Sequence, residues 1–192
     1  MSELEKQIIE TFNFSEEEYK SIEKFFHSKK LKKGEYFLKE GYSARQMGFV
    51  EKGILREYLY LNDKEITKWF STQGNFAVDL TAFLSNHKSR VNYQAVTDTQ
   101  MLTLSKNDYD KLGDKLPRWH KLEKMFLAKC FSILENRVIS HLGLDSEARY
   151  SQFFSLYPTL FNQVPLNQLA SLLGMTAETL SRIRKKQAYL NS

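Results

Sequence analysis

The side chains best suited to chemistry lie near the end of the 192-residue sequence, at Glu178, Ser181 and Arg182. Spacings of three and four residues place all three on one face of a helix. Arginine can donate two hydrogen bonds to a guanine edge, glutamate can accept one from cytosine, and serine can serve several base edges. The spacing therefore predicts a helix face that reads bases in the major groove of DNA.

The residues around this face have the pattern of a helix-turn-helix. Residues 166–173 carry an apolar stripe, Gly174 permits a sharp turn, and Thr176 is suited to cap a second helix. Leu180 and Ile183 turn inward from that helix. An ordinary solvated face with one Glu–Arg pair would also show the three reading residues, so the prediction depends on the complete two-helix pattern. The side chains predicted to contact DNA phosphates are Thr176, Arg184, Lys185 and Lys186.

A long amphipathic helix is predicted to precede this motif, from Pro117 to about Leu142. Its apolar residues cover more than one stripe, which indicates packing on two partners and favours a homodimer. The alternative is that the same helix is buried within one monomer. Gly143 is expected to end it, and Asp145 or Ser146 is expected to cap the next helix.

The N-terminal half has a different texture. Residues 2–30 are predicted to be helical, with Ser15 as an N-cap. Five of the eight glycines then fall between residues 34 and 74, among short segments rich in β-forming residues. Two more apolar runs extend the pattern to about Ser105. We predict an antiparallel, barrel-like sheet of roughly eight strands, hence an α+β fold class.

Composition excludes several classes of protein. The chain has 42% hydrophobic residues, 3 prolines and a net charge of +5, as expected of a folded protein. Cys130 is the only cysteine, so an internal disulfide and a cysteine-rich metal site are excluded. The first residues form neither a signal peptide nor a membrane span, so we expect a cytoplasmic protein without membrane partners.

The sequence carries no recognisable catalytic motif. Its four histidines are scattered and are expected at the surface or as capping residues; they are His27, His87, His120 and His141. We therefore predict that the protein is not an enzyme and needs neither a metal nor a cofactor.

The order of these parts resembles the Crp/Fnr family of bacterial transcription regulators. The resemblance covers nearly the whole chain and is most specific in Leu169-Ala170, Gly174 and Glu178 to Arg182. It implies a jelly-roll-like β-roll of the cyclic-nucleotide-binding type over 1–116. A dimerisation helix over 117–143 and a C-terminal winged helix-turn-helix over 144–192 would follow.

The resemblance also implies roles for individual residues. Glu178, Ser181 and Arg182 match the base-reading residues of the Fnr-like branch, which implies a palindrome with half-sites resembling TTGA and TCAA. Ala177 replaces an arginine of the Crp branch, which argues against a Crp-type half-site. The cysteine cluster of the oxygen-sensing members is missing, and Cys130 alone is expected to be a small buried hydrophobe.

In family members that bind cyclic AMP, an Arg ten residues after a Glu pairs with the cyclic phosphate. Here Asp79 takes the place of the Glu, and Ser89 lies where the Arg is needed, with Arg90 displaced by one position. A shift of one residue along a strand reverses the direction of a side chain. Cyclic AMP is therefore not expected to bind, and the effector is left open. The candidate effector pocket consists of Asp79, Leu80, Ser89 and Arg90.

Together these features predict a homodimeric regulator that binds double-stranded DNA, with RNA polymerase as a partner if it is an activator. The alternative is a ligand-binding or protein-docking β-roll whose helix-turn-helix does not function. Salt-dependent retention on DNA distinguishes the two.

Overall fold

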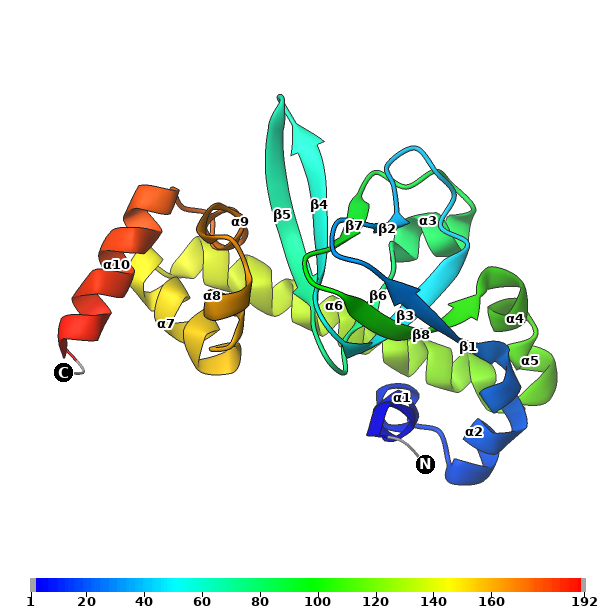
Figure 1. The fold of residues 1–192 in the computed structure, drawn as a ribbon. Helices are drawn as coiled ribbons and strands as arrows, with labels where there is room; N and C mark the ends of the chain where they lie inside the picture. Colours follow the sequence, from blue (N-terminus) through cyan, green and yellow to red (C-terminus); the bar gives the residue numbers. More distant parts are fainter. Residues whose placement is uncertain (1–2, 191–192) are drawn as a thin grey trace. The chain divides into compact units, whose positions relative to one another are not determined.

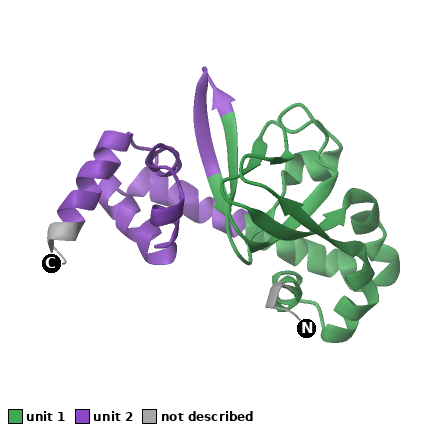
Figure 2. Ribbon diagram, viewed as in Figure 1, with its two compact units in different colours: residues 1–59, 69–130 green, residues 60–68, 131–192 purple. Residues whose placement is uncertain are grey.

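A computed structural model describes residues 3–190 of the chain. These divide into two compact units, shown in Figure 2. The first unit contains residues 1–59 and 69–130, and the second contains residues 60–68 and 131–192.

The first unit begins with helices. Helix α1 spans Glu3–Phe12, α2 spans Glu16–Ile22, and the short 3-10 helix η1 spans Glu23–Phe25. Ser15 caps α2 as predicted, because its hydroxyl accepts a hydrogen bond from the Glu18 N–H while the Glu18 carboxylate accepts one from the Ser15 N–H. The predicted helix over residues 2–30 is wrong in its last part, since a strand begins at Phe26.

Eight strands form the β-roll in two four-stranded sheets (Figure 1). The pairings of β1 with β8, β2 with β7, β3 with β6, β3 with β8 and β4 with β7 are antiparallel. The expected number of strands and the expected topology class are confirmed. The first sheet has the order β1-β8-β3-β6, with β1 at Phe26–Leu31, β8 at Thr99–Ser105, β3 at Gln46–Lys52 and β6 at Phe76–Ala77. The second has the order β2-β7-β4-β5, with β2 at Tyr36–Leu38, β7 at Asn92–Ala95, β4 at Leu55–Leu61 and β5 at Lys64–Ser71.

Aromatic rings fill the core of this unit where helices cover the roll. Phe12 of α1 lies 4.6 Å from Phe126 of the long helix α6 (Trp119–Gly143) and 5.8 Å from Phe49 of β3, measured between ring centroids. All three rings are buried. Each such ring contributes roughly 1.5–3 kcal/mol through burial, which fixes the start of α6 against the roll. The remaining helices of the unit are α3 (Leu80–Ser85), α4 (Lys106–Asp110) and α5 (Leu112–Lys115).

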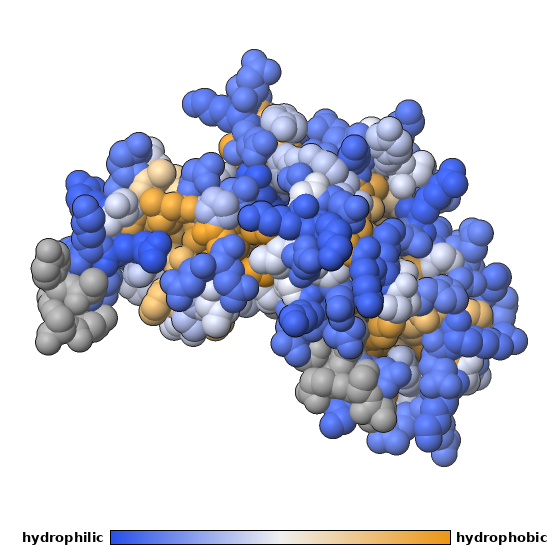
Figure 3. Space-filling view, viewed as in Figure 1, coloured by the Kyte–Doolittle hydropathy of each residue, from blue (hydrophilic) through white to orange (hydrophobic). Residues whose placement is uncertain are grey.

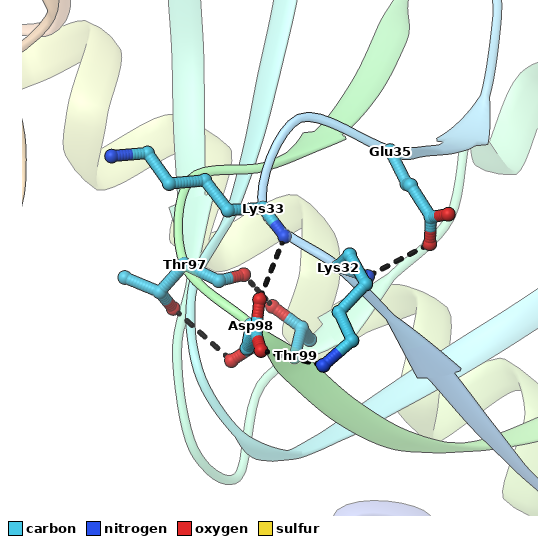
Figure 4. A network of polar contacts seen from close by, with 6 residues as sticks. All are labelled: Lys32, Lys33, Glu35, Thr97, Asp98 and Thr99. Atoms are coloured by element: carbon cyan, nitrogen blue, oxygen red, sulfur yellow. Dashed lines mark hydrogen bonds and ion pairs between the residues drawn. The ribbon is translucent and has the colours of Figure 1, made fainter.

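A polar network joins two turns at one corner of the roll (Figure 4). The Asp98 carboxylate accepts hydrogen bonds from the Lys33 N–H at 2.9 Å and from Lys32 Nζ at 3.1 Å. These bonds hold the pKa of Asp98 below its ordinary value, with the backbone N–H as the larger cause. Gly53 lies against the same corner with φ +98°, and a Cβ there would come within 2.4 Å of the Asp98 carbonyl oxygen.

The second unit is built from helices and the tip of the β4–β5 hairpin. After α6 come α7 (Ser146–Leu156), α8 (Leu160–Gln163), α9 (Leu166–Leu172) and α10 (Ala177–Leu190). The long helix predicted from Pro117 to Leu142 is thus confirmed, and Asp145 caps α7 through the Ala148 N–H as expected. Between residues 144 and 190 the structure contains helices and turns but no strand, so this stretch supplies no wing beside its helix-turn-helix.

The hairpin tip is fastened to α9 within this unit. The Thr67 N–H donates to Ser171 Oγ at 2.9 Å, and Ser171 Oγ donates to the Glu65 carbonyl at 3.3 Å. One serine hydroxyl thereby connects the backbone of β5 to the first helix of the helix-turn-helix.

Candidate nucleic-acid interface

The turn between α9 and α10 has the geometry that a helix-turn-helix needs. Gly174 adopts φ +64°, a left-handed conformation that glycine reaches without strain. The Met175 N–H donates to the Ala170 carbonyl at 3.0 Å, so the carbonyls at the end of α9 gain a partner before the chain turns.

Thr176 caps α10, as the sequence predicts. Its Oγ1 accepts a hydrogen bond from the Thr179 N–H at 3.2 Å. The neighbouring Glu178 carboxylate accepts hydrogen bonds from its own backbone N–H and from the Thr176 hydroxyl, and these lower the pKa of Glu178. Glu178 therefore stays ionised and can only accept hydrogen bonds at neutral pH.

Apolar side chains fix the position of α10 against α9. Leu180 and Ile183 of α10 are buried, as are Leu169 and Ala170 of α9. This packing determines which face of α10 remains outside.

The outer face of α10 carries the predicted reading residues. Glu178 and Arg182 are exposed, and Ser181 is half-buried beside them. Lys185, one turn further on, is also exposed. The arrangement presents one acceptor, one hydroxyl and two cations on the first three turns of a helix, which is chemistry suited to base edges and phosphates.

Two of the predicted phosphate contacts already have partners in the protein. Lys186 Nζ forms an ion pair with the Glu147 carboxylate of α7 at 2.8 Å. The Arg184 guanidinium lies 5.9 Å from the centre of the Phe161 ring and is half-buried. Lys186 and Arg184 would each have to leave that partner to reach a phosphate. Lys185 is exposed and takes part in neither of these two contacts.

Two basic side chains that the sequence analysis did not assign to the motif satisfy the end of α9. Arg149 Nε donates to the Leu173 carbonyl at 3.0 Å, and its Nη1 donates to the Leu144 carbonyl. His141 Nε2 lies 3.3 Å from the Leu172 carbonyl oxygen, which agrees with the expected capping role for a histidine. No sequence signal identifies Arg149, because its Leu173 partner lies 24 residues further along the chain.

The candidate effector residues of the roll are engaged with one another or point to solvent. Asp79 caps α3 through the Ala82 N–H at 3.1 Å, and its other carboxylate oxygen accepts from Ser89 Oγ at 2.8 Å. Ser89 is 2% exposed, and its Oγ also accepts from the Val91 N–H at 3.1 Å. Arg90 is exposed, and Leu80 is half-buried.

A second carboxylate that the sequence analysis missed lies close to this region. Glu57 of β4 is buried and pairs across the sheet with Tyr93 of β7. The pKa of Tyr93 is raised, first by the burial of its own hydroxyl and second by the charge of Glu57. The Tyr93 hydroxyl donates to the Val78 carbonyl at 3.0 Å, next to Asp79. The structure therefore brings acidic groups and a buried serine together at the candidate effector residues, a combination unsuited to an anionic phosphate.

Sites of other kinds are not evident in residues 3–190. No group of three or more His, Cys, Asp or Glu side chains in that range could hold a metal ion. None of its helices is long and apolar enough to cross a membrane. Cys130 is partly buried, and burial raises the pKa of its thiol to about 11, so the thiol stays protonated and unreactive at neutral pH.

Comparisons with known proteins agree with this geometry. Residues 28–115 match the family model of the cyclic nucleotide-binding domain. No curated protein sequence shows a significant match.

Solved structures share the fold across both units. FixK2 from Bradyrhizobium japonicum superposes with a TM-score of 0.72 at 16% identity, covering 86% of each chain. The c-di-GMP responsive global regulator CLP from Xanthomonas campestris gives 0.70 at 16% identity, covering 92% of this chain and 93% of CLP. A transcriptional regulator of the Crp/Fnr family from Eubacterium rectale gives 0.68 at 17% identity, covering 92% and 85%. The resemblance inferred from the sequence is thereby confirmed, and the chain has the Crp-like fold.

Proposed function

We propose that this chain, which has the fold of Crp/Fnr regulators and matches the cyclic nucleotide-binding domain over 28–115, is a sequence-specific DNA-binding transcription regulator. The observation that carries the proposal is the exposed face of α10. Glu178, Ser181 and Arg182 lie together on a helix that is capped, packed on α9 and open to solvent on that face. We divide the chain into a sensor roll over 1–116, a dimerisation helix over 117–143 and a DNA-binding part over 144–192.

Base reading would follow from the chemistry of that face. Arg182 would donate two bonds to a guanine, Glu178 would accept from a cytosine, and Ser181 would contact a neighbouring base edge. We expect half-sites resembling TTGA and TCAA. Thr176 and Lys185 would contact phosphates first, and Lys186 and Arg184 would join them by exchanging their present partners.

The regulator would act as a homodimer. The second half of α6 exposes a run of apolar side chains, namely Phe131, Ile133, Leu134, Val138, Ile139 and Leu142. Four of them, at 131, 134, 138 and 142, follow one another at helical steps and form one stripe. Figure 3 shows apolar surface over this unit. Water-exposed stripes of this kind are unfavourable on a monomer and typical of helix pairing.

Control of the regulator would not involve cyclic AMP, because Ser89 stands where the resemblance requires an arginine and its hydroxyl bonds the Asp79 carboxylate. The sensor unit has a cavity of about 650 Å³ whose lining includes Phe37, Arg45, Gln46 and Lys106. None of the candidate effector residues lines it. The effector is not assigned. RNA polymerase would be a partner if the protein activates, and the protein would act in the cytoplasm.

Selection from random DNA tests the proposal. Purified full-length protein is expected to enrich duplexes that contain two inverted half-sites about 10 bp apart, centre to centre. Retention of those duplexes should fall steeply as salt rises. Enrichment of no sequence, with no salt-dependent retention, would show that the β-roll is a ligand-binding or docking module and that the helix-turn-helix does not function.

A further inference from the structure

The side of α10 that faces away from its reading residues borders a cavity in the second unit. The cavity has a volume of about 520 Å³, within the range of small-molecule sites. It lies among α7, α8 and α10, three neighbouring helices in Figure 1. Its walls are Tyr150 and Phe154 of α7, Phe161 of α8, and Arg184 and Gln187 of α10. Neither the reading face nor the sensor roll contributes to it.

The walls are aromatic and fixed. Tyr150 and Phe161 are buried, with ring centroids 5.3 Å apart at an angle of 76°. Phe154 stacks on Tyr150 at 5.7 Å and lies 5.2 Å from Phe161, yet 42% of it is exposed. A large aromatic side chain that is held by two ring contacts and still open to water offers a flat surface for a second ring.

The charge of the cavity has one sign. Among the described residues that line it, Arg184 is the one charged side chain, and no carboxylate lies opposite. Its guanidinium is half-buried and lies over Phe161 at 5.9 Å. Amide and hydroxyl groups of Ser151, Thr159, Asn162 and Gln187 complete the rim. A guanidinium in such a setting can donate two parallel hydrogen bonds to a carboxylate.

We infer that this cavity is a binding site for a small planar aromatic carboxylate, with its ring on Phe154 and Tyr150 and its carboxylate on Arg184. A single cation matches a monoanion better than a phosphate, which carries more charge. The aromatic walls exclude highly polar anions of the same charge, because these would lose water without gaining apolar contact. The ligand would contact neither Glu178 nor Arg182, so the site goes beyond the proposed base reading. It shares only Arg184 with the proposed phosphate contacts, and a bound carboxylate would hold that side chain away from DNA.

The test is calorimetric titration of the full-length protein, without DNA, with 2-naphthoate. We expect a dissociation constant below about 1 mM. The neutral isostere 2-naphthamide should bind at least about tenfold more weakly, because it cannot form the charge-assisted pair. Arg184→Gln should weaken 2-naphthoate binding by a similar factor, while the matched control Lys185→Gln, on the exposed face of the same helix, should change it less than about twofold.

Phe154→Ala is a second test variant, at a residue that is partly exposed, and it should also weaken 2-naphthoate binding at least about fivefold. Thermal melting of each variant confirms that it is folded. Absence of heat at about 5 mM 2-naphthoate, equal binding of acid and amide, or an Arg184→Gln variant that binds like the wild type would each overturn the inference. Because no DNA is present, none of these results bears on the proposed function, which fails or stands on the DNA selection alone.

Discussion

Single side chains on α10 have separable roles in the proposed DNA complex. Arg182 and Lys185 are both exposed; in the proposed complex Arg182 would read a base edge and Lys185 would contact the backbone. Arg182→Ala should cost roughly 1–3 kcal/mol per half-site and relax the preference at one base pair. Lys185→Ala should weaken binding to all sequences alike and reduce the slope of the salt dependence by about one. Binding titrations on matched and single-base-variant duplexes measure both, and identical behaviour of the two variants would contradict these roles.

The prediction that cyclic AMP does not bind depends on Ser89. Its hydroxyl bonds Asp79 at 2.8 Å, so the phosphate of the nucleotide would meet a serine and a carboxylate in place of an arginine. Loss of a charge-assisted contact to a buried phosphate costs on the order of 2–5 kcal/mol, or roughly thirty- to several-thousand-fold in affinity. Calorimetric titration with cyclic AMP and cyclic GMP should therefore show no micromolar binding.

The matched variant for this prediction is Arg90→Ala. Arg90 is exposed, so its removal should leave the titration unchanged. Micromolar binding that Arg90→Ala abolishes would mean that a local bulge turns this side chain inward when the nucleotide is present.

Asp98 gives one corner of the roll a dependence on pH. Its pKa is lowered by the Lys33 N–H and by Lys32. Because its pKa is lowered in the folded state, ionised Asp98 stabilises the fold at pH values above about 3.9, the pKa of an aspartate in the unfolded chain. This stabilisation disappears as the pH falls through the folded pKa. Asp98→Asn should therefore lower the thermal midpoint at pH 7, with a difference from the wild type that narrows below about pH 4. Asp114→Asn, at another exposed aspartate of the same unit, controls for the loss of one negative charge.

At the scale of elements, local patterns predicted what depends on local structure. The period of α6 placed its ends at Pro117 and Leu142, within two residues of the observed Trp119–Gly143. Strand β1 was missed because its polar run His27 to Lys30 has no strand signal, and its conformation is imposed by pairing with β8 from Phe26↔Leu104 to Leu31↔Thr99.

The same distinction applies to the sites. The reading face of α10 depends on the period of one helix, so three residues sufficed to predict that it would be exposed. The hydrogen bond between Ser89 and Asp79 joins the loop after α3 to the residue that caps the start of α3. The approach of Glu57 to Tyr93 depends on the register of β4 with β7. Neither is contained in the spacing of one segment.

Gly53 shows how one turn holds the β-roll elements in register. A Cβ at this position would strike the Asp98 carbonyl at 2.4 Å and would also require φ +98°. Gly53→Ala should lower the free energy of unfolding by more than about 2 kcal/mol, because strain and a backbone clash add. Gly41→Ala is the matched control, since Gly41 has φ +81° with nothing within 4 Å of the added Cβ, and should cost only about 1–2 kcal/mol. Equal losses in denaturant titrations would show that the clash is relieved by a small shift of residues 97–99.

At the scale of the whole molecule, reading a palindrome requires two copies related by a two-fold axis. The stripe on α6 supplies a surface that can pair with itself. Leu134 lies in that stripe and is 55% exposed, while Leu156 of α7 is 65% exposed and lies outside it. We expect the wild type to be a dimer and Leu134→Lys to be a monomer in light scattering at micromolar concentration, because the lysine would place a charge in the proposed apolar helix pair.

The effect on DNA follows from the loss of symmetry. A monomer keeps its reading face on α10 but binds one half-site at a time, so Leu134→Lys should lose the preference for two inverted half-sites and retain weak, salt-sensitive binding. Leu156→Lys carries the same substitution on a similarly exposed leucine and should remain dimeric with unchanged DNA selection. If the wild type scatters light as a monomer, the α6 stripe does not pair with a second copy. The prediction of a palindromic site would then be contradicted, because no two-fold symmetric protein would exist to read it.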